Sequence, residues 1–235
     1  MQLTVRDVAS LLNVSEKTVY RWIKDRGIPA YRINDQYRFH RAELLEWATA
    51  KRIGLSADIF HEEADLSAHV PSLADALTAG GVLYRVVGDN TESVLRAAVD
   101  AMRLPDEVDR EQLVRVLVTR EALASTGIGD GIAIPHVRNP IVLHVPRPTI
   151  TLCFLERPVE FGALDGKAVH CLFMLVSPTV RAHLQLLSRL AFALHDSAFR
   201  DILKRQALRD EILTEVRRIE ASLPPQHSAT AEPRV

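Results

Sequence analysis

The chain has 235 residues, of which 47% are hydrophobic, and its formal net charge is −1 at pH 7. It contains neither an apolar run long enough to span a membrane nor a signal-peptide pattern, so we expect a soluble, cytoplasmic protein without membrane insertion. This near-zero net charge is unevenly distributed along the chain. Residues 1–52 carry ten Lys or Arg against six Asp or Glu, whereas the remainder carries 19 against 24. A basic first segment followed by an acidic remainder indicates two modules with different partners.

The first fifty residues predict a helix-turn-helix. Thr4 and Asp7 have the spacing of a capping box, and apolar residues follow at helical intervals. Ser15 is placed to cap a second helix over residues 16–24, whose inner face holds Val19 and Trp22. Two short helices joined by so tight a turn are typical of DNA-binding modules, and the outer face of the second is long, polar and mostly basic. The residues of that face expected to contact DNA are Lys17, Thr18, Tyr20, Arg21 and Lys24.

The stretch "AYRINDQYRFH" alternates around Asn34–Asp35 and predicts a hairpin wing, with Arg32 and Arg38 near DNA phosphates; "AELLEWA" predicts a third helix. Residues 3–49 resemble the excisionase-like, winged helix-turn-helix family related to the MerR regulators, through "LTVRDVASLLNVSEKTVYRWI", "GIPAYR" and "QYRF". The resemblance implies DNA binding. It departs at the wing tip, where Asn34–Asp35 replaces a glycine-containing turn. The alternative is a small helical module used for protein docking.

Helices and strands interleave in the rest of the chain, which predicts an α/β domain with a mixed sheet flanked by helices. We expect a winged domain at 1–50, a linker at 51–65, the α/β domain at 66–221 and a disordered tail at 222–235. Cys153 and Cys171 fall inside apolar strands and are expected to be reduced core residues. Expected helices cover residues 73–81, 92–104 (capped by Thr91), 109–124, 180–196, 198–206 and 209–220, and expected strands cover 82–87, 149–156 and 168–176.

The stretch "STGIGDGIAIPH", Ser125 to His136, joins hydroxyls and glycines to one histidine. Read alone, it is either a hairpin-like turn with a surface histidine or a loop whose backbone N–H groups bind an anion. Arg120 precedes it, and His183 lies near the start of a helix, where negative charge is favoured. These groups around one nucleophilic imidazole suit phosphoryl transfer, which depends on positioning and electrostatic stabilisation. The expected phosphoryl-binding residues are Ser125, Thr126, Gly127 and Gly129.

Residues 66–221 closely resemble the enzyme IIA components of the bacterial phosphotransferase system, of the fructose–mannitol and nitrogen-regulatory type. The resemblance rests on "RxxxxSTGIGxGIAIPH", "FxALDGKxV" and "AHLxLLSRL". It implies that His136 is phosphorylated, with Arg120 and His183 at active-site positions, and that phospho-HPr is the donor. A IIB component or a regulatory target would be the downstream partner. "VRNP" (137–140) replaces the glycine and lysine usual after the histidine, which leaves that partner open.

No cofactor is expected. A zinc site made by His136, His170 and His183 is disfavoured, because no carboxylate or cysteine lies at ligand spacing. Two main functions compete: a phosphorylation-responsive DNA-binding regulator, and a phosphoryl carrier to a separate IIB component that uses its first module for docking. A docking protein that never touches DNA is a third. The basic first module, and the lack of a IIB-like or membrane-spanning IIC-like segment in these residues, favour the regulator. The small footprint of one DNA-binding module suggests either a homodimer or a second DNA-binding partner.

Overall fold

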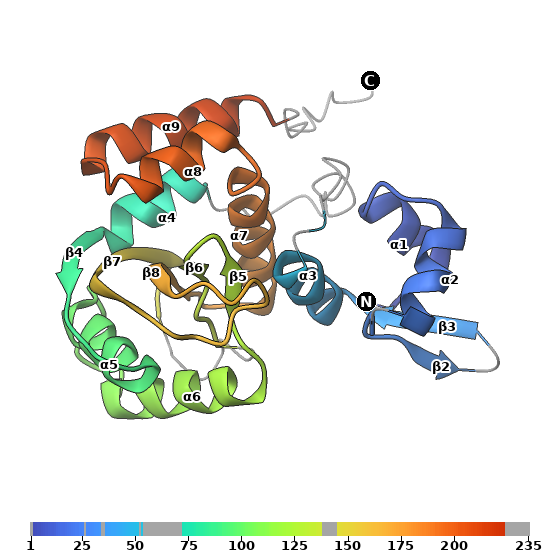
Figure 1. Cartoon of the computed structure of the whole chain (residues 1–235), viewed down its shortest axis with the longest axis horizontal. Helices are drawn as coiled ribbons and strands as arrows, with labels where there is room; N and C mark the ends of the chain where they lie inside the picture. Colours follow the sequence, from blue (N-terminus) through green and yellow to red (C-terminus); the bar gives the residue numbers. More distant parts are fainter. Residues whose placement is uncertain are drawn as a thin grey trace, which may run out of the picture.

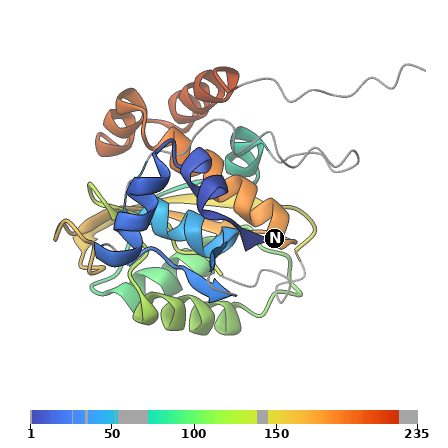
Figure 2. The same ribbon diagram turned by 90° about the vertical axis from the view of Figure 1, so that its right-hand side faces the viewer.

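The computed structural model of the chain describes residues 2–25, 27–33, 36–51, 53, 72–137 and 145–223. They form a small N-terminal unit and a larger C-terminal unit, which lie side by side in Figure 1, and the small unit lies in front of the larger one in Figure 2. Within these ranges, no helix is long and apolar enough to cross a lipid bilayer. The described part of the small unit comprises β1 (Gln2–Leu3), α1 (Val5–Leu11), α2 (Glu16–Asp25), β2 (Tyr31–Ile33), β3 (Gln36–His40) and α3 (Arg41–Ala50).

Local sequence signals set the boundaries of the small unit as expected. At the start of α1 the Asp7 amide donates to the Thr4 hydroxyl at 3.2 Å, and the Thr4 amide donates to the Asp7 carboxylate at 2.8 Å. The hydrogen bonds from Thr4 hold the pKa of Asp7 below its usual value. The Ser15 hydroxyl accepts from the Thr18 amide at 3.2 Å and caps α2. Strands β2 and β3 form the antiparallel hairpin, whose tip, Asn34–Asp35, lies outside the described residues.

The apolar faces of α1, α2 and α3 meet over strand β3. Val8, Val19, Phe39 and Leu44 are fully buried in this core, which we call the winged-module cluster. Because the apolar residues of α2 all face this core, its charged residues remain on the opposite face, in solvent. The winged helix-turn-helix architecture is therefore confirmed.

The C-terminal unit is built on a five-stranded mixed sheet with the strand order β4-β7-β8-β6-β5. β4 runs parallel to β7 and β6 parallel to β8, whereas the β7/β8 and β5/β6 pairs are antiparallel. The expected mixed α/β domain is confirmed. Its described elements are α4 (Leu73–Gly80), β4 (Val82–Val86), α5 (Thr91–Ala101), α6 (Arg110–Leu123), β5 (Gly127–Gly129), β6 (Ile132–Ala133), β7 (Thr149–Val159), β8 (Val169–Val176), α7 (Val180–Ala193), α8 (Ser197–Lys204) and α9 (Arg209–Ala221).

Helices cover both faces of this sheet (Figure 1). Ile150, Leu152 and Phe154 of β7 pack with α4, α7, α8 and α9, whereas Cys153 and Leu155 point to the other face and pack with α5 and α6. A strand buried on both faces is apolar throughout rather than alternating, which matches "TITLCFLE". Burial raises the pKa of the Cys153 thiol to about 12. Both cysteines are free and buried, as expected.

Several expected boundaries were wrong: α5 and α7 end at Ala101 and Ala193, each three residues earlier than expected. Asn90, not Thr91, caps α5: its side chain accepts from the Ser93 amide at 2.9 Å, while the Thr91 hydroxyl donates to the Glu160 carbonyl. Asparagine is at least as good an N-cap as threonine, and Asn90 has the extended backbone that a cap requires. Strand β7 continues to Val159 because that residue still pairs with Val169 of β8. Most of the expected linker and tail lies outside the described residues.

Candidate functional site

The glycine-rich motif folds as a β-hairpin that leads to His136. Strands β5 and β6 are antiparallel, and Asp130 and Gly131 connect them with φ of 52° and 74°. Asp-Gly is a favoured pair for turns in which both central residues have positive φ. The chain then passes through Ile134 and Pro135, and His136 forms a β-bridge with Leu175 of β8. The hairpin expectation was right for the backbone, but the histidine is buried and not on the surface, with 4% of its area exposed.

The imidazole of His136 is held in one tautomer by its own backbone. Its Nδ1 lies 2.7 Å from the carbonyl oxygen of Ile134. A carbonyl oxygen only accepts hydrogen bonds, so Nδ1 is the donor and carries the proton. In the neutral ring the lone pair is then on Nε2. Nε2 is therefore the nucleophilic nitrogen of this side chain.

Helix α7 brings His183 next to His136. The Thr179 hydroxyl accepts from the Ala182 amide and caps α7, so His183 belongs to its first turns. The two imidazole centroids are 5.2 Å apart with their planes at 44°, and His183 is 3% exposed. The positive end of a helix macrodipole favours an anion in this position. The structure thus joins two of the three expected catalytic residues in direct ring contact.

The last turn of α6 carries Arg120 and an acidic residue that sequence reasoning missed. Arg120 is 9% exposed and donates from its guanidinium to the Ala124 carbonyl at 2.8 Å. Glu121 accepts from the Thr126 amide at 2.8 Å and from the Thr126 hydroxyl at 2.5 Å. Glu121 thereby ties the start of the hairpin to the helix that carries Arg120. The sequence signal that could have identified Glu121 is its position, directly after Arg120 and five residues before Thr126.

The four residues expected to bind the phosphoryl group lie at the base and along the first strand of the hairpin. The Ser125 hydroxyl donates to the Phe161 carbonyl at 2.5 Å and accepts from the Gly127 amide at 3.0 Å. Gly127 also packs closely, because an added Cβ would lie 2.8 Å from the Cβ of Ala163, and Gly129 pairs with Ile132. In this conformation the Ser125 and Thr126 hydroxyls hold the hairpin in place. Their role in phosphoryl binding remains a prediction.

His170 lies away from the pair of histidines. It is five residues before Leu175 on β8, and Leu175 is the bridge partner of His136, so about 17 Å of strand separates them at about 3.3 Å per residue. Burial lowers the pKa of His170 and favours its neutral form. Among the described residues, no group of three His, Cys, Asp or Glu side chains could hold a metal ion. Arg138, which follows the motif, lies outside the described residues.

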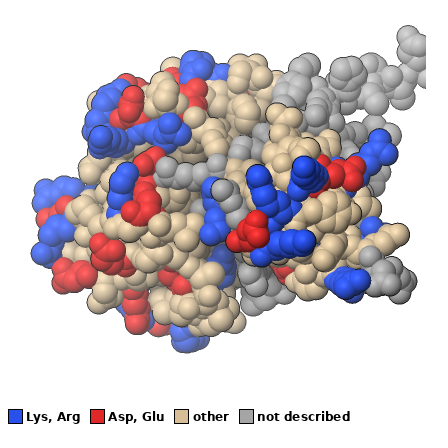
Figure 3. All heavy atoms as spheres, turned by 45° about the vertical axis from the view of Figure 1, so that its right-hand side comes forward, with Lys and Arg blue, Asp and Glu red and all other residues tan. Residues whose placement is uncertain are grey.

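The residues expected to contact DNA gather on the winged module. Thr18 is half-buried, with its hydroxyl 2.9 Å from that of Ser15, and Arg38 donates to the Gln36 side chain at 2.7 Å. Figure 3 shows Lys and Arg side chains grouped on the face of this module that is turned to the viewer. The remaining expected contacts are all exposed: Lys17, Tyr20, Arg21, Lys24 and Arg32.

Residues 76–218 match the family model described as phosphoenolpyruvate-dependent sugar phosphotransferase system, EIIA 2. The match spans more than half of the chain and includes the whole stretch from Arg120 to His183. The chain belongs to this EIIA 2 family. A helix-turn-helix domain model matches residues 3–52, so a helix-turn-helix domain precedes the EIIA 2 domain.

The relatives of the EIIA 2 domain include regulatory and sugar-specific proteins. A nitrogen regulatory protein of Pseudomonas aeruginosa is 40% identical over 136 residues, covering 56% of this chain and 86% of the relative. A fructose-specific EIIA component of Haloferax volcanii is 34% identical over 130 residues, covering 53% of this chain and 80% of the relative. The crystal structure of the nitrogen regulatory protein IIA-Ntr from Neisseria meningitidis aligns with a TM-score of 0.50 and 29% identity, over 57% of this chain and 91% of that chain.

Proposed function

We propose that this chain is a DNA-binding regulator whose EIIA 2 domain accepts a phosphoryl group on Nε2 of His136 from a phosphohistidine donor of the HPr type. The observation that carries the proposal is the hydrogen bond from Nδ1 of His136 to the Ile134 carbonyl. That bond leaves the lone pair on Nε2 and fixes the direction of the ring. A preset tautomer and a fixed ring lower the cost of reaching a reactive geometry.

Transfer exchanges one phosphorus–nitrogen bond for another. As Nε2 of His136 bonds to phosphorus, the bond to the donor imidazole breaks and its electron pair returns to the donor ring. The Nδ1 proton stays on His136, where the Ile134 carbonyl accepts it and stabilises the positive charge that the substituted ring gains. Arg120 and His183 stabilise the phosphoryl oxygens, assisted by the N-terminus of α7.

The direct test is to incubate the full chain with phosphoenolpyruvate, enzyme I and HPr, and to map the modified residue by mass spectrometry under conditions that preserve phosphohistidine. We expect one label, on His136, and none in His136→Ala. The matched control is His170→Ala, which removes another buried ring nitrogen at a distance from the site and should be labelled like the wild type. A label that persists in His136→Ala, or that maps elsewhere, contradicts the assignment.

The DNA-binding half of the proposal rests on the exposed basic face of α2 and the wing beside it. A helix lying in the major groove needs long donor side chains that point away from the core, and Lys17, Arg21 and Lys24 do so. The buried apolar residues of α2 are committed to the winged-module cluster and leave this face free of packing. Gel-shift titration of the full chain against a DNA library tests this half independently of phosphorylation.

A phosphoryl carrier to a IIB component is the second candidate, favoured by the similarity to a fructose-specific EIIA component. In that case the phosphorylated chain loses its label within seconds when a fructose-type IIB domain is added. A regulator keeps the label under the same conditions. The rate of label loss with and without the IIB domain separates the two functions.

A further inference from the structure

The winged module packs directly on the EIIA 2 domain through α3. Helix α3 contacts both α7 and β5. The winged-module cluster of buried residues extends across this contact, because it includes Ala191 of α7, and Leu184 packs against it. Figure 1 shows α3 between α7 and the other two helices of the winged module. The two units therefore share apolar packing.

Helix α7 serves both the phosphoryl site and this contact. Leu184 and Ala191 are seven residues apart, close to two helical turns, so they lie on one face of α7. His183 precedes Leu184 and is rotated from it by about 100°, which turns its ring toward His136. Strand β5 follows Thr126 directly and also touches α3. Helix α3 thus rests on the helix that carries His183 and on the strand that holds the glycines expected to bind the phosphoryl group.

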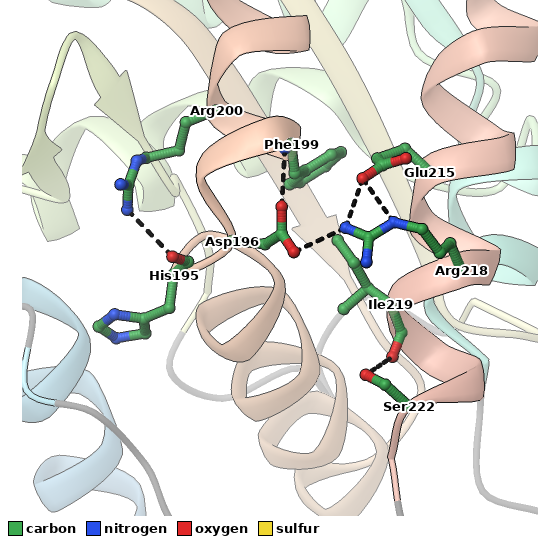
Figure 4. Close-up of polar contacts among 8 residues, drawn as sticks. All are labelled: His195, Asp196, Phe199, Arg200, Glu215, Arg218, Ile219 and Ser222. Carbon is green, nitrogen blue, oxygen red and sulfur yellow. Dashed lines mark hydrogen bonds and ion pairs between the residues drawn. The ribbon is translucent and has the colours of Figure 1, made fainter.

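The contact ends at a rigid corner between α7 and α8. Arg200 donates to the carbonyls of Leu194 and His195, and Asp196 accepts from the Phe199 amide at 3.0 Å and from Arg218 of α9 at 2.6 Å. Figure 4 shows the bonds of Asp196 to Phe199 and Arg218 and the bond of Arg200 to His195, with the His195 ring pointing away from them. A corner braced in this way keeps its shape when a neighbour leaves.

The packing at this end is incomplete. A small cavity of about 30 Å³ lies between Thr49 of α3 and residues that include Ile128, Ala191 and His195. The Thr49 hydroxyl is buried there with no hydrogen-bond partner among the described residues. An unsatisfied buried hydroxyl destabilises the docked state relative to one in which water reaches it. Domains of one chain commonly move relative to each other unless the interface between them is large and hydrophobic.

Both imidazoles of the proposed phosphoryl site are buried in this docked arrangement. His136 and His183 are 4% and 3% exposed, and their rings are in contact. A phosphoryl group on Nε2 brings about −1.5 to −2 charges and new volume to this buried ring. The docked state is thus less compatible with the phosphorylated ring than an open state. A ligand or modification that favours one state shifts the population toward it.

We propose that the contact of α3 with α7 and β5 is a phosphorylation-sensitive docking interface, closed while His136 is unmodified and released when it is phosphorylated. The proposal rests on the proposed function, because it needs His136 to be the acceptor. Linkage requires the reverse effect as well: a chain whose winged module is undocked binds the phosphoryl group more readily. The interface thereby connects the state of His136 to the freedom of the DNA-binding module.

The test uses the full chain with Ala191→Glu, which places a carboxylate in the apolar contact. The matched control is Ala198→Glu, the same substitution at an exposed position of α8. Thr49→Glu places a carboxylate on the α3 side of the same contact. It replaces Ala191→Glu in the experiment if that variant does not fold. Small-angle X-ray scattering measures the radius of gyration before and after complete phosphorylation by phosphoenolpyruvate, enzyme I and HPr. The equilibrium distribution of the phosphoryl group between HPr and each variant is measured separately with a limiting amount of phospho-HPr.

We expect the wild type and Ala198→Glu to expand on phosphorylation. We expect Ala191→Glu or Thr49→Glu to be expanded already and to take a larger share of the phosphoryl group from phospho-HPr, with an equilibrium constant raised by roughly fivefold or more at the lower end of typical coupling between sites. An unchanged wild-type radius on full phosphorylation, or a folded, expanded variant with the wild-type equilibrium constant, overturns the coupling. Absence of label on His136 in every variant overturns the proposed function and the coupling together, whereas the unphosphorylated scattering curves still establish whether the contact exists.

Discussion

Glu121 acts on the site through its two hydrogen bonds to Thr126. Glu121→Gln replaces a charged acceptor by a neutral one, and a bond to a charged group contributes about 1.5–3 kcal/mol. We expect labelling of His136 to slow by roughly tenfold, since about 1.4 kcal/mol is tenfold in rate, because the hairpin start is no longer held against α6. Single-turnover labelling measures the rate. The exposed Glu156→Gln is the control, and a wild-type rate in Glu121→Gln shows that this bond is dispensable.

Arg120 and His183 are expected to bind the phosphoryl oxygens in the transition state. Each charge-assisted bond contributes about 1.5–3 kcal/mol, so Arg120→Ala and His183→Ala should each lower the transfer rate by roughly tenfold to a hundredfold. Thermal unfolding and circular dichroism establish that the variants are folded before rates are compared. If both folded variants transfer at the wild-type rate, neither residue takes part.

The β5–β6 hairpin depends on glycine at its turn for two separate reasons. Gly131 has φ of +74°, and an added Cβ would lie 2.6 Å from Cδ2 of His170. Gly166 has a similar φ of +67° but nothing within 4 Å of the same position, so Gly166→Ala measures the backbone strain alone. We expect Gly166→Ala to cost about 1–2 kcal/mol of unfolding free energy, and Gly131→Ala to cost more. Urea unfolding compares them.

The double variant Gly131→Ala with His170→Ala separates the two causes. Removing the His170 ring should restore the stability that is lost through the clash. The loss that is caused by the positive φ should remain. Equal losses in Gly131→Ala and Gly166→Ala mean instead that the His170 ring moves aside freely.

The whole molecule should bind DNA through its basic unit despite a net charge of −1. When binding releases counterions, the logarithm of the binding constant falls linearly with the logarithm of the salt concentration. The slope is about −0.9 for each phosphate that the protein contacts. Lys17→Ala and Lys24→Ala should each reduce that slope by about 1 if the side chain contacts a phosphate. Fluorescence anisotropy at several salt concentrations measures the slope. Arg157→Ala, exposed on the other unit, is the control, and an unchanged slope in both lysine variants removes them from the interface.

The sequence by itself predicted most of the elements and a candidate acceptor, His136. The Thr4–Asp7 capping box, the hairpin around residues 34–35 and the run from Ser125 to His136 are local patterns, whose physical causes act within a few residues. The same locality explains the misplaced cap of α5. Asn90 and Thr91 are adjacent cap-forming residues, and the contact of the Thr91 hydroxyl with the Glu160 carbonyl helps to set which one caps.

Only the tertiary structure decided how these pieces meet. The ring contact of His136 with His183, the bonds of Glu121 to Thr126 and the packing of α3 on α7 join segments through the folded chain. The Nδ1 bond that selects Nε2 spans only two residues, yet it requires a backbone angle set by the β-bridge to Leu175. Burial and tautomer depend on which surfaces exclude water and which groups approach within bonding distance, and residue order alone does not specify those distances.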